Sequence, residues 1–596
     1  MYKLGTACVI LVASIGPLGR SQQSCEFPAY GWTRTAAYPH ESEEMATDVA
    51  LDADGNVILA GELRAAPGTL IDLDPTEGVD LHSAYGDQDI FVTKLGPDGS
   101  YRWAYIIGAF GPEAPEGVAA DRDGNVYVTG WFGQGLVKGY TVDFDPTEGV
   151  DERATVICSD AFFTRINANG SYGWTHTLPG TDCERGADVA VGPDGDVIVA
   201  GEFGGDLDFD PGEGKDEHSS GRGRDAFVSK FRTDGSYAWT VDFGDDESAS
   251  AWAIAPRDNG AIAVTGRFSG QVDFDPRPRR VDMHDSGQAI HVFVTLLTPD
   301  GTPRWTRTFG GKKPWPEDSA YSYGVATGAR GSIWVAGAFR GKADFDPGPR
   351  KFVRIDPGDK GIYVSKFDQA GTWLWSWVPR NGEEDDTAEG IGVDGDAGAF
   401  VVGEFGLTVD FDPEGEGDPR TSVGGSDFYV AHLGGDGSYA WTVTAGSTWL
   451  DSANGISVDP DGRILFGGQF HWTIDFDPTE GIDNHTSDAH TDYFTSRWYC
   501  GACPAIYAHR AEGGAGQISV YLHTTTPGGR ALVRCRGRAG QGTFDKNAWL
   551  DWDGKLQTVI APVPPGKYTC AVQKLRSAGR EVQCPRRASP RRVVVE

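Results

Sequence analysis

The chain is poor in the features of helical proteins. It has only three methionines among 596 residues and no long stretch with apolar residues at helical spacing, which excludes helical bundles, coiled coils and doubly wound α/β folds. Positive charge is also scarce, because 52 Lys and Arg against 86 Asp and Glu leave a net charge of −34. So acidic a chain does not suit nucleic acid as its partner. The 83 glycines and 34 prolines, with 11% aromatic residues, indicate many short strands joined by turns, and we predict an all-β protein.

Long hydrophobic runs are absent after the first twenty residues. The single apolar run, from Leu4 to Leu18, follows Lys3 and is shorter than the ~20 residues that span a bilayer. Such a run is typical of a secretory signal peptide, which we assign to residues 1–24. We therefore predict a secreted protein, extracellular or at the cell surface, with no transmembrane segment in the mature chain.

Recognised catalytic motifs are missing as well. The chain contains no His-Glu-x-x-His, no Gly-x-Ser-x-Gly and no phosphate-binding glycine loop. The sialidase Asp-box fails in register, because Gly99 directly follows Asp98 ahead of Trp103. We therefore predict a non-enzymatic scaffold for cell-surface or extracellular interaction. The alternative is a carbohydrate-active or other hydrolytic enzyme whose site is assembled from several blades at a channel mouth.

One unit recurs through the first five hundred residues, and tryptophan marks it. Each unit has two alternating stretches joined by an Asp-Gly turn, an Asp-x-Asp-Pro tetrad, a third alternating stretch and a tryptophan strand. Four-stranded units in tandem are typical of a β-propeller. We predict seven four-stranded blades over residues 25–499, with about twenty residues of loop around each tetrad. The marker residues are Trp32, Trp103, Trp174, Trp239, Trp305, Trp375 and Trp441.

The two ends of the repeat array complement each other. The repeat array begins with a tryptophan strand near Tyr30 and ends with a strand of the third kind, which begins at Asp492. The two ends therefore supply one blade together. Superposed on an internal unit, Cys25 and Cys500 fall at the turn that this blade lacks. We predict a Cys25–Cys500 disulfide, with Cys503 as the alternative partner, and a closed, monomeric ring.

Cysteine usage agrees with export. Removal of the signal peptide leaves eight cysteines, an even number that favours disulfides in a secreted chain. We expect Cys158 and Cys183 to pair with each other within the propeller.

The units resemble the secreted bacterial seven-bladed β-propeller repeat family, often called SBBP repeats. The resemblance rests on DAFVSKFRTDGSYAW, which starts at Asp225, and on DRDGNVYVTG, which starts at Asp121. It covers about Cys25 to Trp498 and implies the propeller fold and an extracellular or cell-surface location. It implies no shared catalytic residues, and the Asp-x-Asp-Pro segment departs from the simplest family pattern.

Four of the tetrads open a nine-residue segment with acids at positions 1, 3, 6 and 9. Such oxygen clusters suit Ca²⁺ and resemble the calcium loops of integrin-type propellers, which carry a further acid where this chain has Thr or Gly. The alternative is that the acids accept hydrogen bonds from the turn itself, since the tetrads at Asp273 and Asp344 persist without the later acids. The candidate calcium ligands are Asp72, Asp74, Glu77, Asp80, Asp143, Asp145, Glu148, Asp151, Asp208, Asp210, Glu213, Asp216, Asp475, Asp477, Glu480 and Asp483.

A further regularity concerns the Gly-x-Phe that ends the second stretch of each unit. The middle residue differs from unit to unit while its neighbours barely vary, which marks either unconstrained surface or a position that contacts a ligand. We predict that these residues form a rim that binds an extracellular protein or polysaccharide. Calcium, at the acidic loops, is the only cofactor that we predict. Its members are Glu62, Trp131, Glu202, Arg267, Glu404 and Gln469.

The repeat stops near residue 500 and the charge reverses. Residues 505–596 carry 15 Lys and Arg against 6 Asp and Glu. Strand-like pieces separated by turn residues predict a small, basic β-sandwich-like module over residues 500–596, containing cysteines.

Overall fold

The protein is an all-β chain, as predicted. The computed structural model describes the backbone strands of residues 507–595, without their side chains, and residues 28–499 except 36–41, 134–138, 245–246, 278, 329, 357, 359, 381–383, 396–397, 460–461, 480 and 488–489. Within these residues no helix is long and apolar enough to cross a bilayer. The predicted signal peptide and the predicted Cys25–Cys500 disulfide lie outside the described residues.

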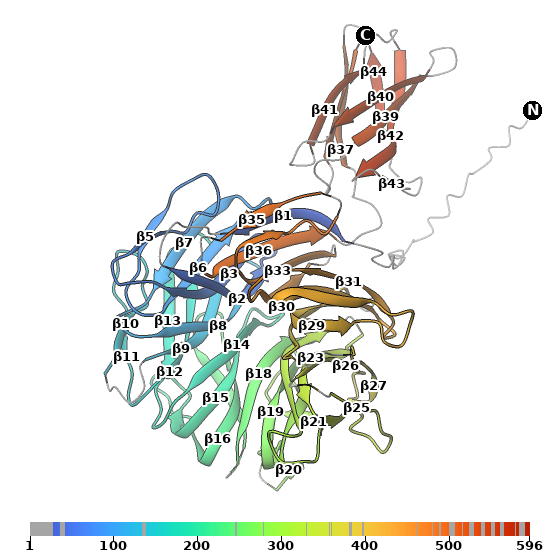
Figure 1. Ribbon diagram of the computed structural model, residues 1–596. Helices are drawn as coiled ribbons and strands as arrows, with labels where there is room; N and C mark the ends of the chain where they lie inside the picture. Colours follow the sequence, from blue (N-terminus) through green and yellow to red (C-terminus); the bar gives the residue numbers. More distant parts are fainter. Residues whose placement is uncertain are drawn as a thin grey trace, which may run out of the picture.

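Four-stranded antiparallel units make up the main body (Figure 1). Five units are separate sheets, and two lie within a ten-stranded sheet, where Ile290 pairs parallel with Ser319 and Gly310 pairs antiparallel with Asp344. In each unit the first strand pairs with the second, the second with the third and the third with the fourth. The first strands are β2 (Glu43–Leu51), β8 (Glu113–Ala120), β14 (Arg185–Val191), β18 (Ala249–Pro256), β22 (Ser319–Thr327), β28 (Thr387–Val393) and β32 (Ser452–Val458).

The second strands are β3 (Val57–Arg64), β9 (Val126–Phe132), β15 (Val197–Asp208), β19 (Ile262–Asp273), β23 (Ile333–Arg340), β29 (Gly398–Asp410) and β33 (Arg463–Phe470). The third strands are β6 (Asp89–Leu95), β12 (Asp160–Ile166), β16 (Glu217–Phe231), β20 (Met283–Leu297), β26 (Gly361–Phe367), β30 (Pro419–Gly434) and β36 (Asp492–Tyr499). The fourth strands are β7 (Tyr101–Ile107), β13 (Tyr172–Leu178), β17 (Tyr237–Phe243), β21 (Pro303–Gly310), β27 (Trp373–Trp377), β31 (Tyr439–Ala445) and β1 (Ala29–Thr35).

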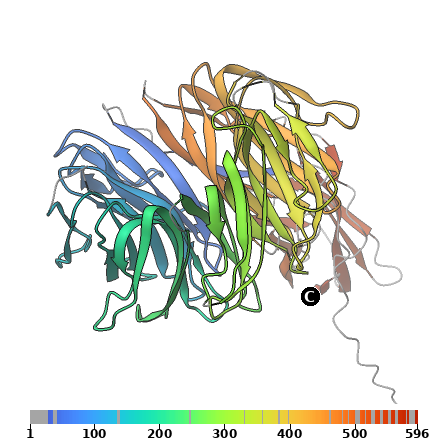
Figure 2. The ribbon, with the colours of Figure 1, turned by 90° about the horizontal axis from the view of Figure 1, so that it is seen from below.

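The N-terminal strand belongs to the last sheet. β1 pairs antiparallel with β36, from Ala29 opposite Tyr499 to Thr35 opposite Phe494, and Figure 1 shows blue β1 beside orange β36. The first strands contact one another in chain order, and β32 also contacts β2. The sheets fan out around these strands when seen from below (Figure 2).

The cores lie between consecutive sheets. One cluster joins Ile58 and Ile90 of the β2-β3-β6-β7 sheet to Val128 and Phe162 of the next, so each sheet is covered on both faces. This explains why strands such as β6 are buried at every position, polar residues such as Asp89 and Lys94 included.

The segments around the tetrads are ribbons rather than the loops that we expected. In three units the second and third strands simply continue into the segment, as β15 and β16 do from Asp206 opposite Ser219 to Asp208 opposite Glu217. In four units a separate short hairpin forms. These hairpins are β4 (Leu70–Asp72) with β5 (Leu81–Ser83), β10 (Thr141–Asp143) with β11 (Glu152–Ala154), β24 (Lys342–Asp344) with β25 (Val353–Ile355), and β34 (Thr473–Asp475) with β35 (Asn484–Thr486).

The C-terminal region forms two antiparallel sheets, ordered β37-β38-β41 and β40-β39-β42-β43 with β44 beside β42. Its strands are β37 (Tyr507–Gly514), β38 (Gln517–His523), β39 (Arg530–Gly537), β40 (Thr543–Trp549), β41 (Lys555–Ile560), β42 (Gly566–Ser577), β43 (Arg580–Val582) and β44 (Arg591–Val595).

The recurring tryptophan connects each sheet to the next. In six of the seven units its ring packs against a glycine in the turn between the third and fourth strands of the following sheet, as Trp32 does on Gly99 and Trp305 on Gly371. Trp441 is the exception, because the third and fourth strands of the last sheet are not consecutive in the chain. The indole N–H of Trp305 also donates to Gln369 O at 3.2 Å. The glycine has φ of +76° at Gly371 and leaves no room for a side chain. The tryptophan spacing therefore marks the contact between sheets.

Gly371→Ala should destabilise the protein by about 2 to 4 kcal/mol, because a Cβ there would lie 2.7 Å from Trp305 Cδ2 in a left-handed backbone. Gly68→Ala is the matched control: Gly68 also has positive φ, at +85°, but nothing lies within 4 Å of its added Cβ. It should cost only about 1 kcal/mol. Urea unfolding measures both, and equal losses would contradict the packing role.

Candidate functional site

A β-bulge occurs at the same place in every first strand. The pairing of first and second strands skips one residue in each unit. A bulge turns a side chain out of the regular alternation and is common beside functional sites. All seven skipped residues line one central cavity of about 510 Å³, and they are Thr47, Glu116, Ala187, Trp252, Tyr323, Glu389 and Asn454.

The cavity is acidic. Its charged lining residues are Asp48, Glu116, Asp188 and Glu389. Asp48 Oδ2 accepts the N–H of Val118 at 2.9 Å, and Asp188 Oδ2 accepts that of Ile254 at 2.7 Å, so these two carboxyls link neighbouring first strands. Burial raises the pKa of Asp48 to about 7 and that of Glu389 to about 7.

The predicted rim residues lie at one level beside this cavity. Each pairs with a first-strand residue two positions before the bulge, as Glu202 does with Arg185 and Arg267 with Ser250. We call this level the mouth. Trp131 Nε1 donates to the bulge residue Glu116 at 3.1 Å. Binding by the rim stays a prediction, as do the roles of the other members, which pair as Glu62 with Met45, Trp131 with Ala114, Glu404 with Thr387 and Gln469 with Ser452.

Opposite charges are paired around much of the mouth. Arg185 contacts Glu116 at 2.7 Å, Arg224 contacts Glu202 at 2.8 Å and Arg64 contacts Glu62 at 3.0 Å. Burial raises the pKa of Glu62 despite the Arg64 charge. Glu404 accepts a hydrogen bond from Ser426 Oγ at 2.7 Å, and burial raises its pKa too.

Aromatic rings and arginines alternate along one side of the mouth. The guanidinium of Arg267 lies 4.8 Å from the Trp252 ring and 5.9 Å from the Tyr321 ring. Arg185 lies 5.3 Å from Trp252, and the Trp252 and Tyr323 rings meet edge to face at 5.7 Å. Trp252, Tyr323 and Arg185 are not among the residues predicted from the sequence. The sequence does contain a signal for the bulge residues, because each stands at the same distance before the Gly-x-Phe of its unit.

The acidic loops are closed by their own carboxylates. Asp72 Oδ1 accepts the N–H of Asp74 at 3.1 Å and of Asp80 at 2.6 Å. The second of these bonds recurs in all seven units, including those that begin at Asp273 and Asp344. The second residue of the tetrad is buried. An example is Phe144, whose ring centroid lies 5.2 Å from that of Phe132. These contacts explain why the tetrad persists where the later acids are lost.

The last acid of the loop binds a tyrosine that the sequence analysis left without a role. Tyr101 donates to Asp80, and the equivalent pairs are Tyr30 with Asp483, Tyr172 with Asp151, Tyr237 with Asp216 and Tyr439 with Asp418. Where Phe352 replaces the acid, Trp373 replaces the tyrosine, and the two rings pack at 5.2 Å. The loop is therefore fastened to the fourth strand.

Calcium binding by these loops stays untested, and the contacts favour the alternative, a turn closed by its own carboxylates. Among the described residues, which exclude Glu480, no loop brings three acidic or histidine ligand atoms within 4.8 Å of one another. We expect the thermal unfolding midpoint in excess EDTA to match that in millimolar Ca²⁺, because backbone N–H groups, Tyr and His already occupy these oxygens. A calcium-dependent rise that disappears in an Asp143→Asn, Asp145→Asn variant would instead establish metal sites.

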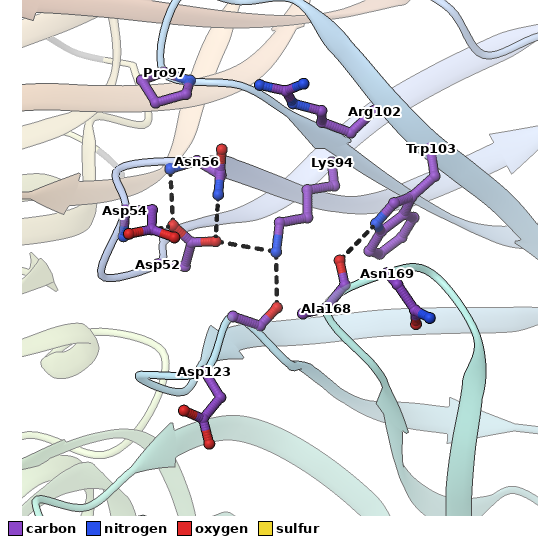
Figure 3. Close-up of a pocket in the computed structure, with 11 residues that line it drawn as sticks. Asp52, Asp54, Asn56, Lys94, Pro97, Arg102, Trp103, Asp123, Ala168 and Asn169 are labelled. Carbon is purple, nitrogen blue, oxygen red and sulfur yellow. Dashed lines mark hydrogen bonds and ion pairs between the residues drawn. The ribbon is translucent and has the colours of Figure 1, made fainter.

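A second hollow, of about 620 Å³, lies between the β2-β3-β6-β7 sheet and the next one (Figure 3). Lys94 Nζ points into it, 3.0 Å from Asp52 Oδ2 and 2.7 Å from the Gly124 carbonyl. Asp52 also accepts a hydrogen bond from Asn56 Nδ2 at 2.8 Å. The charged groups at its centre are therefore engaged in joining two sheets.

Buried carboxyls from consecutive sheets also meet. The N–H of Glu184 donates to Ser159 O at 2.9 Å, which sets Glu184 beside Asp160, and both residues are fully buried. Glu184 Oε1 and Asp160 Oδ1 have no hydrogen-bond partner in the described part of the chain. Burial raises the pKa of Glu184 to about 9, and the Asp160 charge adds to the shift. The same arrangement sets Glu113 beside Asp89.

The predicted Cys158–Cys183 disulfide is confirmed and flanks the first of these pairs. Its Cα atoms lie 5.4 Å apart. Cys158 lies two residues before the start of β12, and Cys183 directly precedes Glu184 in the sequence. The bond therefore ties two neighbouring sheets together at the Asp160 and Glu184 carboxyls.

Comparisons with known proteins give distant relatives. No protein-family model matches the chain, so the likeness to secreted propeller repeats rests on the short motifs quoted above. The chain is 22% identical over 423 residues to an uncharacterized WD repeat-containing protein, L264, of Acanthamoeba polyphaga mimivirus, covering 61% of this chain and 29% of that protein. It is 26% identical over 420 residues to the regulatory protein FlaEY of Caulobacter vibrioides, covering 69% and 37%.

The chain thus spans about a third of the length of the curated relatives it matches. Among solved structures, a fungal alcohol oxidase of the AA5 family in complex with copper aligns over 95% of this chain and 99% of its own, with 12% identity and a TM-score of 0.32. These findings describe a β-rich repeat protein of four-stranded antiparallel sheets with a distant WD-repeat relative.

Proposed function

We propose that this chain is an exported, non-enzymatic β-propeller of seven four-stranded blades that binds an extracellular protein or polysaccharide at the mouth of its central cavity. The observation that carries the proposal is the row of seven bulges, which directs one variable side chain from each unit into a single cavity. A repeated scaffold with a varied lining suits recognition, because the strands fix the positions and the side chains set the specificity.

Three contacts support closure of the ring. β1 pairs with β36, β32 contacts β2, and Trp32 and Tyr493 of the last sheet share a core cluster with Val57 and Phe91 of the first. Closure covers the outer faces of the first and last sheets with each other, so that one chain can act as a monomer.

Export is supported by the N-terminal apolar run, which lies outside the described residues, and by the Cys158–Cys183 disulfide. Disulfides persist in oxidising compartments such as the cell exterior.

Binding is favoured over catalysis because three of the four cavity carboxyls, all but Glu389, are already engaged. Asp48 and Asp188 are occupied by N–H groups of the next first strand, and Glu116 is held by Arg185 and Trp131. A general acid or nucleophile needs an approach to the reacting atom, which these bonds restrict. A hydrolytic site at the mouth is the alternative.

The test is retention on extracellular polysaccharide and surface-protein fractions of the cells that produce the protein. We expect the wild type to be retained and a Trp131→Ala, Trp252→Ala variant to be lost, with Ile482→Ala, an exposed residue of an acidic loop, as control. Equal retention of all three proteins contradicts the proposal. Release of soluble fragments that requires Trp131 and Trp252 favours the hydrolytic alternative.

A further inference from the structure

One arginine at the mouth lacks the partner that its neighbours have. Arg64, Arg185 and Arg224 each contact a glutamate. The guanidinium of Arg267 forms no hydrogen bond or ion pair with any described residue, although the residue is partly buried. A guanidinium in such a place leaves its planar array of N–H donors free for a ligand.

The position of this guanidinium is fixed by rings. It stacks on Trp252 at 4.8 Å, and Tyr321 lies 5.9 Å away on the adjacent unit. Tyr321 is itself held by the indole N–H of Trp315, which donates to its hydroxyl at 3.2 Å. Because stacking restricts the arginine, little conformational entropy remains to be lost when it binds.

Exposed aromatic surface lies beyond Tyr321. Trp315 is 60% exposed and stands in the connection between β21 and β22. Inward, Trp252 and Tyr323 reach the central cavity. Arg267 therefore lies between the exposed Trp315 with its partner Tyr321 and the rings that line the cavity.

We propose that the mouth binds a carboxylated sugar unit of an acidic polysaccharide, with its carboxylate on Arg267 and its ring against the exposed Trp315. This rests on the proposed function and names its ligand class. A planar carboxylate matches a planar guanidinium with two parallel hydrogen bonds, and the apolar C–H face of a pyranose fits an aromatic ring.

The neighbouring charges favour a carboxylate over a phosphate. Glu202 accepts a hydrogen bond from Ser250, the residue that pairs with Arg267 across the strands, and Glu116 and Glu389 line the cavity beyond. A second negative charge on the ligand would face this acidic wall. Sugar hydroxyls, in contrast, can donate to such carboxylates.

The experiment is a calorimetric titration of the full, oxidised chain with two ligands of equal length, an oligogalacturonate and its carboxyl-reduced neutral counterpart. The net charge of −34 repels polyanions, so both titrations use an ionic strength of about 0.15 M, where the Debye length is about 8 Å. We expect the acidic ligand to bind at least about tenfold more tightly.

The variant is Arg267→Gln. It should weaken the acidic ligand about tenfold to a hundredfold, which is what loss of charge-assisted hydrogen bonds costs, and leave the neutral ligand unchanged. Arg354→Gln is the control, because Arg354 also lies on a ring, 3.8 Å from Phe352, but belongs to β25 of the hairpin after the Asp344 tetrad, where it contacts Glu414 at 2.6 Å. It should leave both affinities unchanged.

Three results would overturn the inference: equal affinity for the two ligands, a carboxylate preference that survives in Arg267→Gln, or no binding of either ligand. Retention on the extracellular fractions decides the proposed function separately. If Trp131→Ala, Trp252→Ala abolishes retention while neither sugar binds, the mouth is a binding site for another ligand and only the sugar assignment fails.

Discussion

The oxidised protein should lose stability as the pH rises from about 5 to about 9, and a large part of the loss should come from Glu184. This carboxyl is buried beside Asp160, close to Asp182, and no cation is paired with it among the described residues. Its pKa is raised to about 9, and that of Asp160 to about 7. The folded state therefore holds protons at a pH at which the unfolded chain has released them.

The sign of the effect follows from these shifts. A carboxyl with a raised pKa stabilises the fold fully below its unfolded pKa, near 4.3, and the contribution is lost as the pH rises through the folded value. One such group changes the free energy of unfolding by up to about 1.4 kcal/mol per pH unit within that window. Glu113, whose pKa is raised to about 8 beside Asp89, acts in the same direction.

Glu184→Gln isolates the pair. The amide keeps an oxygen for the N–H of Gly180, which Glu184 Oε2 accepts at 3.2 Å, and adds a donor toward Asp160. Urea unfolding at constant ionic strength should show a flatter pH profile and, at pH 9, a variant more stable than the wild type by on the order of 3 kcal/mol. Glu152→Gln, on the exposed strand β11, should run parallel to the wild type. A Glu184→Gln profile parallel to the wild type would mean that the pair does not retain a proton.

The repeat explains how much of the fold was predictable. Strand type, unit boundaries and the Cys158–Cys183 pairing follow from alternation, turn residues and cysteine position, which are local signals. The ribbons around the tetrads were expected to be loops because strands as short as Thr141–Asp143 show no alternation. The packing of Trp32 on Gly99 joins residues of different sheets, and no local pattern states which sheets are neighbours.

The candidate site was predictable only in part. The variable rim position was found because it differs within an otherwise repeated frame. The bulge residues Trp252 and Glu389 were missed because a bulge breaks the period of two that defines which side chains share a face. The tyrosine contacts to the loop acids could have been found, since Trp373 and Phe352 change together within this one chain.

Trp32→Ala should be more damaging than the same change at an equivalent tryptophan elsewhere in the repeat. Trp32 is buried, and its Nε1 donates to Pro97 O at 3.2 Å in the turn of the next sheet. Its strand β1 is attached to the last sheet by pairing with β36, whereas the other fourth strands are continuous with the third strand of their own sheet. Removing the ring should lower the free energy of unfolding by about 3 to 5 kcal/mol. It should also weaken the attachment of β1 to the sheets on either side.

Trp103→Ala is the comparison, because Trp103 makes the same contact, with Nε1 3.3 Å from Ala168 O, on the internal strand β7. We expect it to destabilise the protein without releasing its strand. In Trp32→Ala, hydrogen exchange should accelerate in both β1 and β36, and the uncovered edge of β36 should promote dimers visible by size-exclusion chromatography.

Equal hydrogen exchange in β1 for the two variants would mean that another connection holds the N-terminal strand. The predicted Cys25–Cys500 disulfide would be such a connection, since Cys25 precedes β1 and Cys500 directly follows β36 in the sequence. The measurement is therefore repeated after reduction of the protein. If β1 is released by Trp32→Ala only in the reduced state, the disulfide and the tryptophan share the closure of the last sheet; if β1 stays protected in both states, neither holds it.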